Sequence, residues 1–147
     1  MSPIRAALPL ILLTLAAGGC GDGEGDSNEF REGYNAAVER LGAINSEIGE
    51  ATGQSNEAIA REFQQLADRT AETRADLSEL SPPEDARDEF DELLASLRQG
   101  IRDLRAVAKA ARSSDPQAAS EAAQKLARTG EEISAAETAL KDEVDGP

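Results

Sequence analysis

The sequence predicts an all-α protein: an antiparallel, up-down-up-down four-helix bundle that follows a signal peptide and a short flexible tether. Three observations favour this class. Apolar residues recur at alternating spacings of three and four in four successive segments, which is the spacing of one face of an α-helix. Helix-start signals fall between these segments. The connections are short, and short connections place successive helices antiparallel to each other.

Residues 1–19 form the predicted signal peptide. Met1 to Arg5 carry one positive charge, and Ala6 to Ala17 are almost wholly apolar. This apolar run is roughly a dozen residues long, whereas a helix needs ~20 residues to cross the ~30 Å core of a bilayer. Its length is typical of the apolar region of a signal peptide. Small residues then precede the one cysteine of the chain, Cys20.

The residues Ala17-Gly18-Gly19-Cys20 resemble the lipobox of bacterial lipoproteins, a family that more often has leucine where Ala17 stands. The resemblance implies cleavage between Gly19 and Cys20 and a diacylglycerol on the Cys20 thiol. It also implies that fatty acids such as palmitate anchor the chain to the extracytoplasmic face of the cell membrane. The alternative is an unmodified cysteine in a degenerate signal peptide. Residues 20–27 are then expected to be a tether, which glycines and carboxylates keep flexible and solvated.

Residues 28–147 form the predicted bundle domain, with helices over residues 28–49, 56–80, 83–112 and 116–143. Each helix carries one apolar stripe, and most residues between the stripes are good helix formers. The first two stripes are Phe30, Tyr34, Ala37, Leu41, Ile44 and Ile48, then Ile59, Phe63, Leu66, Thr70, Thr73, Leu77 and Leu80. The last two are Phe90, Leu94, Leu97, Ile101, Leu104, Ala108 and Ala111, then Ala119, Ala122, Leu126, Thr129, Ile133, Ala136, Leu140 and Val144. An intermolecular coiled coil is the alternative architecture.

The third and fourth predicted helices begin at capping residues. Ser81 is the candidate N-cap of the third helix, and Glu84 is placed to close a capping box with it. Asp115 is the candidate N-cap of the fourth helix, and Pro116 suits the first helical position after it. These signals separate the last three stripes.

The turn at Pro82-Pro83-Glu84, after Leu77 and Leu80, resembles the corresponding turn of small helical lipoproteins of high-GC Gram-positive bacteria. Abundant alanine, and arginine in excess over lysine, are typical of such a source. The resemblance implies a helical body and no particular activity.

Composition excludes several classes of function. The net charge is −14, so we expect no binding to nucleic acid, which needs a basic surface. The membrane is expected to be a partner through the lipid on Cys20 and not through the acidic protein body. The chain has no histidine and a single cysteine, which removes intrachain disulfides, the common ligands of zinc, copper and haem, and the commonest general base. We therefore expect no cofactor and no enzymatic activity; a carboxylate pair is the remaining catalytic alternative.

Three groups of residues are candidate sites. The densest carboxylates could bind a metal, but they lack the glycine turn of a calcium loop and suit a solvated helix start. Tyr34 and Phe63 are expected in the core, although they could line a pocket. The three stripe threonines are expected to donate to a carbonyl one turn back, although they could form a polar lining. The carboxylates are Glu84, Asp85, Asp88, Glu89, Asp91 and Glu92, and the threonines are Thr70, Thr73 and Thr129.

Two functions fit these observations. The first is an interaction or scaffold module at the cell envelope, which implies a protein partner or self-association. The second is a small-ligand-binding lipoprotein with a pocket between its helices. In an upright bundle the connections at 49–56 and 113–116 face away from the membrane, so this distal end is the predicted recognition surface. The small residues beside it allow close helix contact or a shallow groove; they are Ala108, Ala111, Ala119 and Ala122.

Overall fold

The computed structural model describes residues 22–51 and 54–145. The predicted signal peptide, the cleavage position at Gly19 and the lipidation site at Cys20 lie outside the described residues. The described chain forms α1 (Asp22–Glu50), α2 (Asn56–Ser78), the short 3-10 helix η1 (Glu84–Ala86), α3 (Arg87–Ser113) and α4 (Pro116–Asp145). The predicted all-α fold with four long helices is confirmed.

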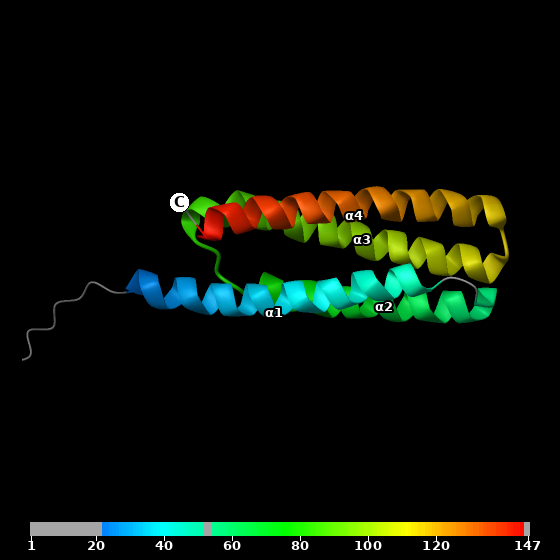
Figure 1. Ribbon diagram of the computed structural model, residues 1–147, viewed down its shortest axis with the longest axis horizontal. Helices are drawn as coiled ribbons and strands as arrows, with labels where there is room; N and C mark the ends of the chain where they lie inside the picture. The colour runs from blue at the N-terminus through cyan, green and yellow to red at the C-terminus, as the bar shows by residue number, and fades with distance from the viewer. Residues whose placement is uncertain (1–21, 52–53, 146–147) are drawn as a thin grey trace, which may run out of the picture.

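The four long helices run side by side and alternate in direction (Figure 1). The start of α1, the end of α4 and η1 lie at one end of the bundle, and the α1–α2 and α3–α4 connections lie at the other. Helix α3 packs extensively against both α2 and α4, and α1 packs less extensively against α2. Helices α1 and α4 approach each other only locally. The up-down-up-down bundle is therefore confirmed, and its α1–α4 side is loosely closed.

Helix α1 starts earlier than predicted. It begins at Asp22, so the described part of the tether expected over residues 20–27, from residue 22 onward, is helical. Glycines and carboxylates favour a solvated tether here, whereas the backbone of the structure continues α1 through them.

Two of the helix starts have a side-chain cap. The Oγ atom of Ser55 accepts a hydrogen bond from the Ala58 N–H at 3.3 Å, which begins α2. The Oδ1 atom of Asp115 accepts from the N–H groups of Gln117 and Ala118, each at 3.0 Å, which begins α4. The predicted Asp115 cap is confirmed.

The predicted capping box at Ser81 and Glu84 is wrong. The extended backbone of Pro83, with φ −52° and ψ 153°, leads into η1, and no side chain caps this turn. Helix α3 then begins at Arg87 behind Ala86, again without a side-chain cap. Two consecutive prolines hold the chain extended past Ser81, so its hydroxyl lies too far upstream to cap a helix that starts after them.

The core consists of two clusters of buried side chains. The first lies toward the start of α1 and contains three aromatic rings: Phe30 stacks on Tyr34 with ring centroids 6.0 Å apart and meets Phe90 edge-on at 5.4 Å. The second lies toward the opposite end and contains Phe63. Tyr34 and Phe63 are therefore core residues, as predicted. Between the two clusters the α1–α4 side of the bundle is hollow.

Candidate functional site

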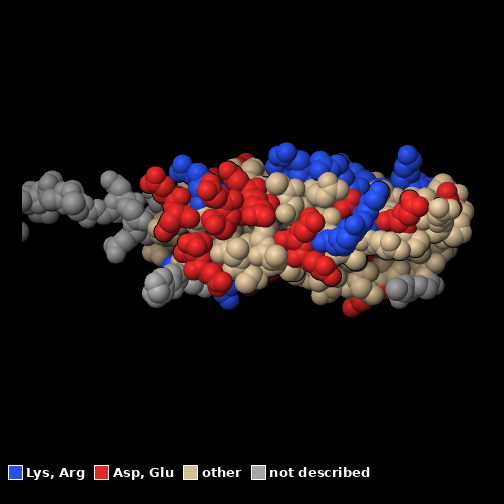
Figure 2. All heavy atoms as spheres, turned by 90° about the horizontal axis from the view of Figure 1, so that it is seen from above, with Lys and Arg blue, Asp and Glu red and all other residues tan. Residues whose placement is uncertain are grey.

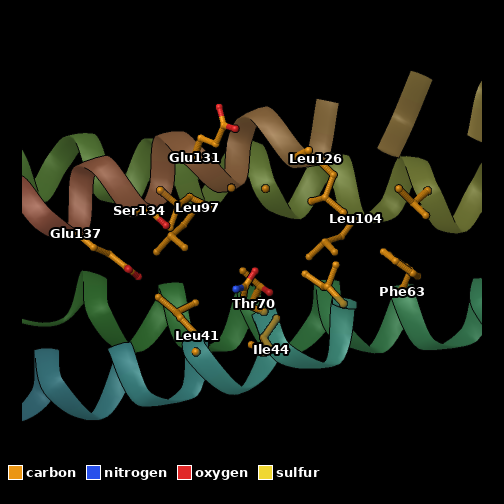
Figure 3. A pocket seen from close by; sticks show the side chains of 18 of the residues that line it. Leu41, Ile44, Phe63, Thr70, Leu97, Leu104, Leu126, Glu131, Ser134 and Glu137 are labelled. Atoms are coloured by element: carbon orange, nitrogen blue, oxygen red, sulfur yellow. The ribbon is translucent and has the colours of Figure 1, made fainter. Parts of the chain in front are cut away.

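A groove of about 780 Å³ lies on the loosely closed side of the bundle. At the end where the chain starts, α1 is tied to α4 by two side-chain hydrogen bonds: Tyr34 Oη donates to the Glu137 carbonyl at 3.2 Å, and Arg31 donates to the Val144 carbonyl. Beyond these ties the groove opens between the two helices, and α2 and α3 contribute its floor (Figure 3).

The groove is lined mainly by apolar side chains from all four helices. Leu41 and Ile44 of α1 face Leu97 and Leu104 of α3 across it (Figure 3). The remaining large apolar side chains of the lining are Val38, Ile48, Phe63, Val107, Leu126 and Ile133. An apolar hollow of this size with a few polar groups is typical of a small-molecule site.

Glycines on the two rim helices help to keep the groove open. A Cβ atom added at Gly42 of α1 or at Gly130 of α4 would meet no neighbouring atom within 4 Å. Neither glycine therefore serves close packing, and glycine inside a helix costs about 1 kcal/mol relative to alanine. Gly100 differs, because a Cβ there would lie 3.2 Å from the Ile133 Cδ1 atom and crowd the contact between α3 and α4.

The charged groups in the lining are both acidic. The carboxylate of Glu137 points into the hollow, whereas that of Glu131 points away from it (Figure 3). Burial raises the pKa of Glu137 above its usual 4.5. Among the described residues, no lysine or arginine lines the groove. The site is therefore an apolar groove with one half-buried carboxyl group that points into it.

Two of the three stripe threonines, Thr70 and Thr73, bond as predicted, and Thr70 also lines the groove, as the alternative had it. Thr70 donates to the Leu66 carbonyl at 2.7 Å, and Thr73 donates to the Arg69 carbonyl at 3.0 Å. The prediction for Thr129 is wrong, because its hydroxyl donates to the carboxylate of Asp103 on α3 at 2.7 Å. A charged acceptor makes a stronger hydrogen bond than a helix carbonyl that already has a partner.

Asp103 is a buried carboxylate that the sequence analysis missed. It is 4% exposed, and its second partner is the side-chain amide of Gln99 at 2.8 Å. One sequence signal was present: Asp103 is the single acidic residue in the run 93–114, where the other charged residues are basic. It joins α3 to α4 and lies outside the groove lining.

We expect Thr129→Val to lower the free energy of unfolding by about 1–3 kcal/mol, because it removes a hydrogen bond from a buried carboxylate. The double variant Asp103→Leu/Thr129→Val should recover most of this loss, since both polar groups are then gone. Urea denaturation measures both. Thr138→Val is the matched control, because Thr138 is exposed and bonds only a carbonyl of its own helix. An equal loss in Thr129→Val and Thr138→Val would contradict the assignment.

The carboxylate cluster lies at the start of η1 and α3. Five of its six side chains are exposed there, and Glu89 is half-buried. Within the described ranges, no three acidic, cysteine or histidine side chains are grouped closely enough to hold a metal ion.

The distal end has a packed structure. Asn56 donates to the Ser114 hydroxyl at 3.2 Å, which links the two connections. Ala108, Ala111 and Ala122 are buried and Ala119 is half-buried, so these small residues lie at helix contacts. The groove of the structure lies along the α1–α4 side instead.

Comparison of the chain with protein-family models, curated proteins and solved structures found no match. None of the described helices combines the length and the hydropathy that crossing a membrane requires.

Proposed function

We propose that this chain is a lipid-anchored extracytoplasmic lipoprotein whose bundle binds an amphipathic small molecule in the α1–α4 groove. The observation that carries the proposal is the groove itself. Its volume, about 780 Å³, falls within the ~300–1,000 Å³ that is common for small-molecule sites. A scaffold role would need no such hollow, so the groove favours the ligand-binding hypothesis.

The lining indicates the shape of the ligand. It runs from Val38 to Ile48 on α1 and from Ala123 to Glu137 on α4. At 1.5 Å per helical residue these spans are about 15 Å and about 21 Å. An extended alkyl chain or a linked ring system of that length would cover the apolar side chains.

The charge of the site indicates the head group. Glu137 is the one carboxylate that points into the hollow, and the whole chain has a net charge of −14. A cationic head group would pair with this carboxylate, whereas an anionic one would be repelled by it. We therefore propose a cationic amphiphile as the ligand class.

The resemblance of Ala17 to Cys20 to a lipobox supports the anchor. Acylation at Cys20 would place the bundle beside a bilayer, in which amphiphiles are concentrated. The ligand would then be available at the bilayer surface, beside which the anchored bundle holds its groove.

Calorimetric titration of the mature chain carrying Cys20→Ser with dodecylamine and with dodecanoate tests the proposal. Dodecylamine should bind at one site per chain and about tenfold or more tightly than dodecanoate, which has the same chain length. Its affinity should rise with pH as Glu137 loses its proton, with a midpoint above 4.5 because burial raises the pKa of this group.

Glu137→Gln should reduce the affinity for dodecylamine about tenfold, which corresponds to about 1.4 kcal/mol. Glu132→Gln is the matched control, because Glu132 is exposed on the same helix and lies outside the groove lining. Equal affinity for the two probes would refute the head-group assignment. Absence of binding by either probe would refute the proposed ligand class.

A further inference from the structure

The outward side of α3 and η1 carries a segregated charge pattern. Helix α3 packs against α2 and α4, and many side chains on its opposite side, continued into η1, are exposed; ten of them form the surface considered below. We call these ten the α3 outer face: Asp85, Asp88, Asp91, Glu92, Ala95, Arg98, Arg102, Arg105, Lys109 and Arg112. Every charged member before Ala95 is acidic and every charged member after it is basic; the neighbouring exposed Arg87 is the one basic side chain near the acidic half. On the face seen from above, which α4 covers in part, Figure 2 shows acidic side chains gathered toward the end where α4 finishes and basic ones along one edge beyond.

The helix dipole explains only part of this pattern. It favours acidic residues in the first turn and basic residues in the last turn, and its effect falls off within those turns. Arg98, Arg102 and Arg105 lie in the middle of α3, at least two turns from its end at Ser113. Of these three arginines, only Arg105 has an ion-pair partner among the described residues, Asp68.

We propose that the α3 outer face binds the same face of a second copy of this chain, antiparallel, with the twofold axis beside Ala95. Three acidic residues lie ten, seven and three positions before Ala95, and three arginines lie at the same distances after it. The axis therefore pairs Asp85 with Arg105, Asp88 with Arg102 and Glu92 with Arg98. Each pair occurs twice, because a twofold interface is made from the same patch on both copies.

The side chains of these pairs are available for contact. Within the described part of the chain, no hydrogen bond or ion pair is formed by the side chains of Asp85, Asp88, Glu92 or Arg98. Arg102 contacts Gln99 of its own helix, and Arg105 lies 3.6 Å from Asp68 with both side chains about half exposed. Such an exposed pair adds little stability and is readily exchanged for another. The small side chain of Ala95 lets the two helices approach at the axis.

The pairing is weak and sensitive to salt. Each exposed ion pair stabilises the dimer only slightly, and added salt screens it. The two chain starts lie at opposite ends of the pair, so two copies anchored in one membrane would lie along its surface. None of the residues of the α3 outer face lines the groove, so this inference stands apart from the proposed ligand.

Disulfide trapping in the full-length chain, in intact cells treated with a thiol oxidant, tests the inference. Ala95→Cys should give several-fold more disulfide-linked dimer than Ala106→Cys. Ala106 is exposed on the same side of α3, but antiparallel pairing places its two copies about 33 Å apart. A disulfide needs Cα atoms about 4.4–6.8 Å apart. The wild-type chain, with Cys20 as its sole cysteine, gives the baseline.

Exchanging the two charges of a predicted pair tests whether its residues face each other across the interface. In the Ala95→Cys chain, Arg98→Glu alone and Glu92→Arg alone should each reduce the dimer several-fold, and the two together should restore it. Equal trapping of Ala95→Cys and Ala106→Cys would overturn the inference. So would a loss of dimer in Arg98→Glu that Glu92→Arg does not recover.

Discussion

Cys20→Ser should move the protein from the membrane fraction to the soluble extracytoplasmic fraction or the medium, or leave its signal peptide uncut. Acylation requires the thiol, and serine offers none to the lipid donor. Two acyl chains hold a protein stably at a bilayer, because each buried CH₂ contributes ~0.8 kcal/mol, whereas one chain holds it only marginally. Cell fractionation and the mass of the mature N-terminus measure the outcome.

Ser27→Ala is the matched control for the anchor. It removes a hydroxyl seven residues beyond Cys20, leaves the thiol in place, and should stay with the membranes and incorporate labelled palmitate. A Cys20→Ser chain that has lost its signal peptide and still partitions with membranes would contradict the lipoprotein proposal.

Helix positions could be predicted because they depend on local periodicity. The stripe from Phe90 to Ala111 specified α3, and the Asp115–Pro116 pair specified the start of α4. Capping by Asp115 needs only a carboxylate two or three residues from the free N–H groups, which is a local relation. Local relations of this kind are readable from the sequence without knowledge of the tertiary structure.

Contacts between helices could not be predicted in the same way. Thr129 was expected to bond its own helix, but Asp103 lies across the α3–α4 contact and accepts its hydrogen bond. The rotation of each helix about its axis decides such a contact, and a stripe of apolar residues fixes that rotation only approximately. The prediction that Ser81 caps α3 was wrong for a related reason. The extended conformation of the two prolines that follow Ser81 outweighed its capping preference.

The groove depends on which side of the bundle stays open, and this is also a tertiary property. Gly42 and Gly130 were the sequence signal for the position of the groove, since each interrupts a helix where alanine would be more stable. The distal alanines predicted close helix contact, with a shallow groove there as the alternative. In the structure those alanines lie at helix contacts, and the hollow lies between the glycines of α1 and α4.

Filling the groove should abolish ligand binding without destabilising the fold. Leucine at Gly42 and Gly130 would occupy the rims of the hollow, and a Cβ at either position clashes with nothing. Each substitution also favours the helix by about 0.5–1 kcal/mol, so the double variant should unfold at a urea concentration at or above that of the wild type. Lost binding therefore could not be attributed to unfolding.

The most direct measurement compares dodecylamine binding by Gly42→Leu/Gly130→Leu with binding by Gly49→Leu. Gly49 also lies on α1 with no atom within 4 Å of a Cβ, but it is outside the groove lining, so leucine there changes the helix and leaves the hollow unchanged. We predict that calorimetry detects one site in the wild type and in Gly49→Leu, and none in the double variant. Wild-type affinity in a folded double variant would contradict the assignment of the α1–α4 groove as the binding site.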